Sequence, residues 1–261
     1  VKSRRVLVTG ADGFIGKNIV VRLCEIANTK VLKFVRGDSI KNLHKLVMQS
    51  DLIIHLAGEN RPVDDAKFTI VNVDLTRALC EAIKDSGRNI PLTFASSTQV
   101  IHNNLYGESK LSAEVIVKKL VEETKNTVTI YRLPGVFGKW CKPNYNSVVA
   151  TFCFNIARGL DIQIHNSKSS MELVYIDDFA NDMLLNLDAS TPGLFLGKLS
   201  KTYTISVGAL ADKITSFKNC RSNLMVEKVG DGFAKRGFLI KANAAAPKAE
   251  KANAETLGEA K

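Results

Sequence analysis

The feature that most constrains the fold of this chain is a regular alternation of two kinds of segment over its first 133 residues. Short runs of β-branched and apolar residues are each followed by a longer segment in which apolar residues recur every three to four positions. That order is typical of βαβ units, whose crossover helices make successive strands parallel. We therefore predict an α/β fold with a doubly wound parallel sheet. The expected strands are 5–9, 30–35, 51–56, 91–96 and 127–132, and the expected helices are 14–28, 40–49, 64–86 and 106–124.

After residue 133 the alternation weakens, which predicts a small C-terminal lobe interleaved with the core. We expect a helix from Ser147 to Arg158 that ends at Gly159, a short strand at 161–165, and a helix capped by an aspartate near Asp177. The predicted division is a core at 1–133, a lobe at 134–240 and a disordered tail at 241–261. The tail holds eight alanines and four lysines but one large aliphatic residue, so it cannot anchor a core.

Composition limits the partners of the chain. A formal net charge of +10 suits an anionic ligand, but the basic residues are dispersed and only 7% of residues are aromatic, which disfavours nucleic-acid binding. No apolar run is long enough to cross a membrane. The five cysteines include no CxxC pair, and there are four histidines, so neither a disulfide framework nor a metal site is indicated. We expect a protein of the reducing cytoplasm.

A glycine-rich loop follows the first expected strand. Residues 9–16 read TGADGFIG, directly before an apolar-periodic helix. Gly10 permits a tight turn, Gly13 lets the backbone approach a pyrophosphate, and Gly16 lets the helix lie close to the strand. The helix N-terminus adds N–H donors and a positive dipole end. The loop predicts a dinucleotide-binding site whose candidate residues are Gly10, Asp12, Gly13, Phe14, Ile15 and Gly16.

The end of the second expected strand bears on which dinucleotide binds. Proteins that select NAD usually place an acidic residue there for the ribose hydroxyls, whereas a 2′-phosphate requires a cation. Here the strand ends in Arg36, whose guanidinium can grip a phosphate with two parallel bonds. We therefore expect NADP(H). The alternative is a solvated arginine at a strand end.

A tyrosine and a lysine spaced four residues apart open the helix at 106–124. Tyr106 and Lys110 lie on one face of that helix, so the ammonium can approach the phenol and lower its pKa toward neutrality. The preceding strand ends in Ser96 and Ser97, at the edge of the sheet where such folds bind ligands. The three groups together predict proton transfer next to a bound dinucleotide.

The motifs together resemble the extended short-chain dehydrogenase/reductase superfamily. The resemblance rests on TGxxGxxG, Leu56-Ala57-Gly58, Asn72, Ser97, and Tyr106 with Lys110. It implies a Rossmann-type sheet with a substrate-binding lobe and cofactor contacts from Leu56, Ala57, Gly58 and Lys110. It further implies that Ser97 holds a substrate carbonyl, that Tyr106 transfers the proton, and that Lys110 binds the nicotinamide ribose. For Asn72 a role in bracing the backbone is expected.

A narrower resemblance covers roughly residues 5–240. The segments 106–111, 132–138, 137–147 and 150–158 are similar to nucleotide-sugar reductases of capsule and O-antigen assembly. That resemblance implies NADPH-dependent reduction of the C4 ketone of a UDP-2-acetamido-2,6-dideoxy-hexos-4-ulose. Family members typically carry a C-terminal cupin domain that has no counterpart in this sequence. By analogy, the helices at 64–86 and 106–124 pair across a two-fold axis in a homodimer.

The loop at 138–146 is the strongest candidate for contacts with the UDP-sugar. Its cations can pair with a diphosphate and its aromatic residue can cover a ring, although a folded surface loop is the alternative. The candidate substrate-binding residues are Asn60, Arg61, Lys139, Trp140, Lys142, Asn144 and Arg158.

Three other activities compete with reduction. Sugar 4,6-dehydratases of the superfamily carry two acidic residues after the catalytic hydroxyl residue, and here these positions are Thr98 and Gln99, which disfavours dehydration. A 4-epimerase keeps NAD bound and prefers an acidic strand end, which Arg36 opposes; it remains the second choice. A dinucleotide-sensing protein without catalysis would have no need of Tyr106 and Lys110.

Overall fold

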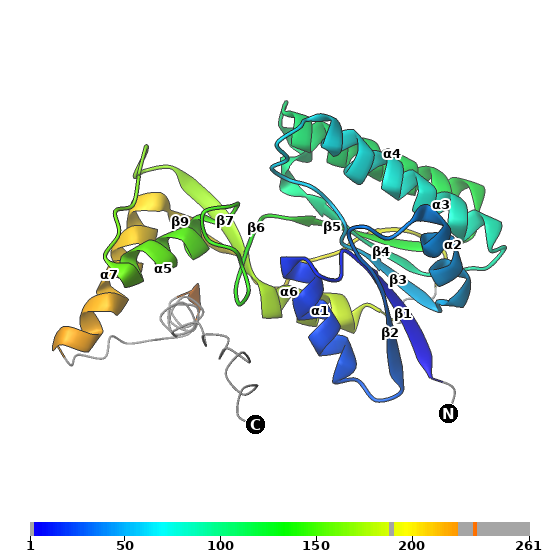
Figure 1. The fold of residues 1–261 in the computed structure, drawn as a ribbon, viewed down its shortest axis with the longest axis horizontal. Helices are drawn as coiled ribbons and strands as arrows, with labels where there is room; N and C mark the ends of the chain where they lie inside the picture. The colour runs from blue at the N-terminus through cyan, green and yellow to red at the C-terminus, as the bar shows by residue number, and fades with distance from the viewer. Residues whose placement is uncertain (1–2, 188–190, 224–231, 234–261) are drawn as a thin grey trace, which may run out of the picture.

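The computed structural model describes residues 3–187, 191–223 and 232–233, and it confirms a Rossmann-type parallel sheet (Figure 1). The strands are β1 (Arg4–Thr9), β2 (Thr29–Phe34), β3 (Leu52–His55), β4 (Leu92–Ser97), β5 (Thr127–Leu133) and β8 (Gly193–Leu196). They are all parallel, in the order β2-β1-β3-β4-β5-β8. The chain moves from β1 outward to β2 and then returns to the other side of β1 as β3. A sheet of this kind binds ligands beside the carboxyl ends of the strands at such a reversal.

Helices cover both faces of the sheet because apolar residues alternate along its buried strands. Val6 and Val8 enter the core cluster on one face, whereas Leu7 enters the cluster on the other. The first face is covered by α1 (Phe14–Cys24) and α6 (Ile176–Leu185), and the second by α2 (Ile40–Gln49), α3 (Leu75–Asp85) and α4 (Leu105–Glu123).

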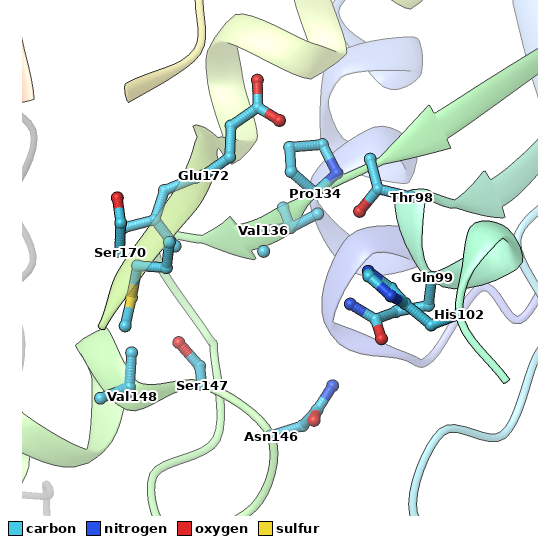
Figure 2. A pocket seen from close by; sticks show the side chains of 13 residues that line it. Thr98, Gln99, His102, Pro134, Val136, Asn146, Ser147, Val148, Ser170 and Glu172 are labelled. Atoms are coloured by element: carbon cyan, nitrogen blue, oxygen red, sulfur yellow. The ribbon is translucent and has the colours of Figure 1, made fainter. Parts of the chain in front are cut away.

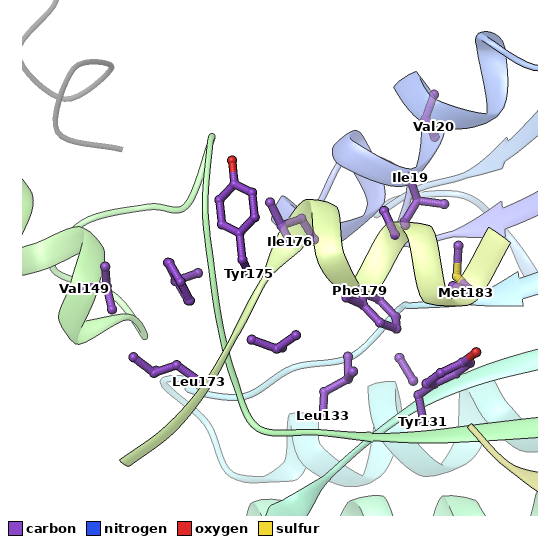
Figure 3. Packing of buried hydrophobic residues seen from close by; sticks show 14 of the residues in the cluster. Ile19, Val20, Tyr131, Leu133, Val149, Leu173, Tyr175, Ile176, Phe179 and Met183 are labelled. Carbon is purple, nitrogen blue, oxygen red and sulfur yellow. The ribbon is translucent and has the colours of Figure 1, made fainter. Parts of the chain in front are cut away.

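A second, three-stranded sheet lies beyond the carboxyl ends of the first (Figure 1). It consists of β6 (Gly135–Phe137), β7 (Ser170–Tyr175) and β9 (Tyr203–Ser206), accompanied by α5 (Val148–Arg158) and α7 (Val207–Asn223). Figure 3 shows that one buried cluster runs from α1 and α6 into this lobe, with Phe179, Leu173 and Val149 along its length. The division at residues 133 and 134 stays a prediction, and the expected tail at 241–261 lies outside the described residues.

Two elements begin or end away from their predicted positions. The first helix ends at Cys24 instead of residue 28, because Asn28 adopts a left-handed conformation (φ 58°) that no helix can continue through. The segment predicted as one helix at 64–86 contains a π-helical stretch, Phe68–Asp74, directly before α3. The expected α5 forms as predicted, with the Ser147 hydroxyl accepting from the Ala150 N–H and Gly159 in the left-handed conformation.

Two local predictions are wrong. Residues 161–165 form no strand, and four of the five are exposed, so the alternation of Ile162 and Ile164 with polar residues does not mark a buried face. The cap of α6 is also different: Tyr175 occupies the N-cap position, and both aspartates lie inside the first turn. There Asp177 pairs with Lys139, while Asp178 accepts a hydrogen bond from Tyr203 at 3.0 Å. Both aspartates therefore pair with residues from other segments instead of capping the helix.

Candidate active site

The glycine loop is packed so tightly that two of its glycines cannot be replaced by a residue with a side chain. Gly10 adopts a left-handed φ of 67°, and a Cβ there would lie 2.8 Å from the backbone of Ala57. A Cβ on Gly16 would lie 2.1 Å from the Gly10 carbonyl oxygen. The loop therefore directs the N-terminus of α1 toward the crevice, where the first N–H groups of a helix are available to an anion.

The end of β3 lies against this loop and against α4. The close approach of Gly10 to Ala57 joins the first two predicted cofactor segments. A Cβ on Gly58 would lie 3.4 Å from the Lys110 Nζ. The glycine loop, the β3 end and Lys110 thus form one continuous cradle, whose missing side chains leave room for a dinucleotide backbone.

Arg36 meets a carboxylate that the sequence prediction missed. Its guanidinium lies 2.7 Å from Glu59 Oε2, and the Glu59 side chain is buried while that of Arg36 is exposed. Tyr145, from the loop at 138–146, donates to the other Glu59 oxygen at 3.0 Å. An acidic group therefore does stand near Arg36, but the segment after β3 supplies it instead of β2.

Asn72 braces the backbone, as predicted. Its side-chain oxygen accepts from the Glu59 N–H at 2.8 Å, and its amide donates to the Glu59 carbonyl and to the Ser109 hydroxyl, both at 2.9 Å. Because Ser109 belongs to α4, these bonds hold the segment after β3 against the helix that carries Tyr106 and Lys110.

Ser97 lies close enough to Tyr106 for its hydroxyl to act on the phenol, so the structure brings together two of the predicted catalytic residues. Burial raises the pKa of Tyr106, and the hydrogen bond from Ser97 lowers it by less. The expectation that Lys110 lowers this pKa toward neutrality is therefore wrong in this structure. Desolvation outweighs the attraction of any nearby cation, and the phenol keeps its proton at neutral pH.

Lys110 is buried beneath the site. Its ammonium donates to the Ala95 carbonyl oxygen at 2.7 Å and lies 4.9 Å from the centre of the Phe94 ring. Burial lowers the pKa of Lys110 to about 8, against the opposing influence of Glu114. The amine thus remains largely protonated at neutral pH, within reach of Gly58.

A cavity of about 410 Å³ opens between the sheet and the lobe (Figure 2). Its lining begins at Thr98, the residue after Ser97, and includes none of Ser97, Tyr106 and Lys110. Figure 2 shows side chains from both sides of it, with Gln99 and His102 from the segment after β4, and Ser170 and Glu172 from β7. The start of α5 closes it, with Asn146 among the residues there. Its walls are mostly polar, which suits a sugar. The lining residues are 98, 99, 102, 134–136, 146–148 and 170–173.

None of the predicted substrate-binding residues lines this cavity. Lys139 pairs with Asp177 at 3.5 Å and lies 5.6 Å from the centre of the exposed Trp140 ring. Lys142 lies 5.8 Å from the Tyr145 ring centre. The pair with Asp177 joins the loop at 138–146 to α6, whereas the two ring contacts lie within the loop.

The remaining candidates lie in three places: after Glu59, near the start of α5, and at the end of α5. Asn60 and Arg61 follow Glu59, and the charge of Arg61 acts on the Tyr145 phenol. Asn144 adopts a positive φ of 52° and donates its N–H to Thr151 at the start of α5. Arg158 stacks on Phe154 at the opposite end of α5, so the structure does not bring it to the cavity.

The sequence prediction missed three buried titratable residues, and the signals for them differ. Glu114 follows Lys110 by four residues, a spacing that places it on the same helical face and could have been noticed. Glu59 directly follows the Leu56–Gly58 motif, but nothing in the sequence links it to Arg36. His55 reads as an ordinary strand residue until its neighbours are known.

Two further features of the described residues bear on function. In these ranges no group of three or more His, Cys, Asp or Glu side chains is arranged to hold a metal ion. None of the helices in the same part of the chain has the length and apolar character needed to cross a membrane.

Comparisons with known proteins agree with this geometry. The chain is 45% identical over 231 residues to the UDP-2-acetamido-2,6-beta-L-arabino-hexul-4-ose reductase of Pseudomonas aeruginosa, which covers 88% of this chain and 62% of that protein. The capsular polysaccharide assembling protein CapF from Staphylococcus aureus superposes with a TM-score of 0.82 at 32% identity, covering 92% of this chain and 66% of that one. The chain thus spans less than two thirds of either protein.

The fold is also found in a structure that contains a dinucleotide. The UDP-glucose 4-epimerase of Thermus thermophilus, in complex with NAD, superposes with a TM-score of 0.74 and covers 93% of this chain and 99% of that one. Its 19% identity makes this a likeness of fold alone. The sequence profile of a single family, however, matches residues 6–195, which is most of the chain. The chain therefore belongs to the NAD dependent epimerase/dehydratase family.

Proposed function

We propose that this chain is an oxidoreductase that uses NADPH to reduce the C4 ketone of a UDP-2-acetamido-2,6-dideoxy-hexos-4-ulose, a precursor of surface polysaccharide. The observation that carries the proposal is the meeting of three groups at the end of β4. Ser97 acts on the Tyr106 phenol, the Lys110 ammonium donates to Ala95, and a polar cavity begins at the next residue, Thr98. The name of the Pseudomonas relative supports the same reaction and substrate class.

In the proposed reaction each catalytic side chain has a separate task. The reduced dinucleotide, when bound, supplies the hydride. Ser97 donates a hydrogen bond to the carbonyl oxygen, and Tyr106 protonates that oxygen as negative charge develops on it. Lys110 holds the nicotinamide ribose and, as a cation, stabilises the phenolate that remains.

The residues of the cradle fit the dinucleotide. Gly10, Asp12, Gly13, Phe14, Ile15 and Gly16 would hold the pyrophosphate at the N-terminus of α1, and Leu56, Ala57 and Gly58 would line the nicotinamide half. Arg36 would bind the 2′-phosphate. To do so it would leave Glu59, because a phosphate carries more negative charge than a carboxylate. That exchange is the basis for proposing NADPH over NADH.

For the substrate we propose two contact regions. The sugar enters the cavity beside Ser97, and the diphosphate lies toward the loop that carries Lys139, Trp140, Lys142 and Asn144. Asn60 and Arg61 border the same region. Arg158 lies at the far end of α5 from the cavity, so we propose that it acts on the substrate only through its charge and makes no direct contact.

The ionisation of Tyr106 favours reduction over epimerisation. A reductase needs a proton donor at the start of its reaction, and a phenol whose pKa is raised by burial is one at neutral pH. A 4-epimerase begins by oxidising an alcohol and needs the phenolate at that point. Thr98 and Gln99 both line the cavity and carry no carboxylate, so dehydration lacks its acid and base.

We also propose a cytoplasmic homodimer that binds no nucleic acid. Leu111 and Val115, which are 41% and 58% exposed, lie one turn apart on the outer face of α4. A second copy of this chain that packs α3 and α4 against their equivalents would cover them.

The test is a coupled assay with a freshly generated UDP-2-acetamido-2,6-dideoxy-hexos-4-ulose. We expect oxidation of NADPH in amounts equal to product, and transfer of deuterium from nicotinamide C4 to the sugar C4 when deuterated NADPH is used. Isomerisation of a UDP-sugar without net NADPH consumption would establish the epimerase instead. Binding of cofactor with neither reaction would favour the sensing alternative.

A further inference from the structure

We propose that Glu114 is a positioning residue for this reaction: its buried carboxylate fixes α4 against the ends of β4 and β5, and its negative charge balances the buried Lys110 ammonium one helical turn away. The inference rests on the proposed function, because it concerns how the site of that function is held.

Glu114 is completely buried and forms three hydrogen bonds. Its Oε1 accepts from the Ser96 hydroxyl at 2.6 Å and from Arg132 Nε at 3.0 Å, while its Oε2 accepts from Arg132 Nη2 at 2.7 Å. Ser96 and Arg132 are direct partners in the pairing of β4 with β5. The carboxylate therefore joins one helix to two adjacent strands, and such burial of a charge is tolerated because it is paired and hydrogen-bonded.

Ser96, the strand residue that donates to Glu114, lies between Ala95 and Ser97, the two strand residues next to Lys110 and Tyr106. Ala95, immediately before Ser96, accepts the hydrogen bond from Lys110, and Ser97, immediately after it, lies beside the Tyr106 phenol and acts on it. On α4, Tyr106, Lys110 and Glu114 follow one another at four-residue intervals on one face. A single carboxylate thus sets the alignment of the helix and the strand end on which the three catalytic side chains stand.

The charges around Lys110 show why the carboxylate also matters electrostatically. On its own helix Lys110 faces Glu114 and the uncharged Tyr106. From β3 it faces His55, whose pKa is lowered to about 3 by burial and by Lys110, so that His55 is neutral. From β5 comes Arg132, which is partly exposed and already paired with Glu114.

Glu114 therefore supplies the opposing charge for a buried ammonium. Burial has already lowered the pKa of Lys110 to about 8, and the charge of Glu114 opposes a further fall. Without that charge the amine would lose its proton closer to neutral pH, and both the ribose contact and the cation beside the phenol would weaken.

The test compares Glu114→Gln with wild type in NADPH affinity and single-turnover reduction, each from about pH 6 to pH 10. Glutamine preserves the shape and removes the charge. We expect the alkaline limb of both profiles to move about one pH unit lower, so that turnover at about pH 8.5 falls up to tenfold while at about pH 6 it stays within threefold. Glu122→Gln, an exposed substitution on the same helix, should match wild type.

A second variant separates charge from geometry and remains informative if Glu114→Gln does not fold. Glu114→Asp keeps the charge but withdraws it from Ser96, so the alkaline limb should stay in place while turnover falls severalfold at every pH. Unchanged profiles for Glu114→Gln, or an equal loss at every pH together with a lower melting temperature, would overturn the proposal.

The two proposals can fail separately. If wild type binds NADPH but reduces no keto-sugar, the proposed function fails, and the pH profile of NADPH affinity still tests the role of Glu114. If reduction occurs and the limb does not move in Glu114→Gln, only the role of Glu114 is refuted.

Discussion

At the residue scale, Tyr106 and Lys110 lie one helical turn apart, and burial acts on their pKa values in opposite directions. It raises the pKa of the phenol and lowers that of the amine, because in each case desolvation penalises the charged form. The result at neutral pH is a protonated phenol above an ammonium, which is the ionisation state that reduction of a ketone requires.

Replacement of Tyr106 by phenylalanine should lower single-turnover NADPH oxidation by about 10² to 10⁴, the usual contribution of a positioned acid. Fold and NADPH affinity should change little, because phenylalanine keeps the ring that packs against Phe68 and removes only the hydroxyl. Tyr203→Phe, which removes a phenol from the lobe, is the matched control. A rate within threefold of wild type would remove Tyr106 from the mechanism.

Arg36 provides the residue-scale prediction for the cofactor. Arg36→Ala should weaken NADPH binding about tenfold or more and leave NADH nearly unchanged, because NADH lacks the 2′-phosphate. Lys33→Ala removes an equal charge from an exposed position on β2, three residues earlier, and should affect neither cofactor. Equal losses for both cofactors in Arg36→Ala would assign the arginine a structural role through its pair with Glu59.

At the scale of elements, a buried chain of hydrogen bonds ties β1, β3 and α3 together behind the cradle. The Thr76 hydroxyl donates to the Asn72 carbonyl, so it accepts from the Nε2–H of His55 at 2.9 Å. His55 Nδ1 is then the acceptor for the Thr9 hydroxyl at 2.6 Å, and Thr9 in turn accepts from the Ala57 N–H. These bonds require a neutral histidine with its proton on Nε2.

The ionisation of His55 predicts acid sensitivity. Its folded-state pKa of about 3 lies below the unfolded value near 6.5, so below pH 6.5 only the unfolded chain takes up the proton. Stability is complete above that pH and is lost as pH falls toward 3, by up to about 1.4 kcal/mol per pH unit. Urea unfolding should therefore show a loss between pH 7 and pH 5 that is about 2 kcal/mol smaller in His55→Gln. Equal losses in the two proteins would contradict this.

At the scale of the whole molecule, the lobe and the sheet share one core and enclose the cavity between them. Because the buried cluster runs from α1 through α6 into β7 and α5, the walls of the cavity are held by continuous packing. Tyr145 adds a polar link from the lobe side to Glu59 on the cofactor side. The regions proposed to bind substrate and cofactor are therefore linked by continuous packing and by one hydrogen bond.

The assembly of two copies can be tested on the outer face of α4. Leu111→Glu with Val115→Glu should convert the dimer to a monomer in size-exclusion chromatography with light scattering, because two charges would be buried in an apolar interface. Val21→Glu, at a comparably exposed position on α1, is the control. A wild-type monomer, or a dimer that survives the double change, would refute the proposed interface.

The sequence by itself determined the features that depend on neighbouring residues. The strands and helices of the core follow from apolar periodicity, the glycine loop from its spacing, and the shared face of Tyr106 and Lys110 from a four-residue interval. Each of these is a short-range property of the chain. The predicted bracing by Asn72 also proved correct, although its partners come from two other segments.

Only the tertiary structure decided the features that depend on burial or on distant segments. Arg36 meets Glu59 from across the site, and Glu59 meets Tyr145 from the lobe. The alternating residues at 161–165 form no strand, and four of the five are exposed, so the alternation does not mark a buried face. The pKa of Tyr106 rises instead of falling because packing removes water from the phenol, and desolvation is a property of the assembled core that no local spacing contains.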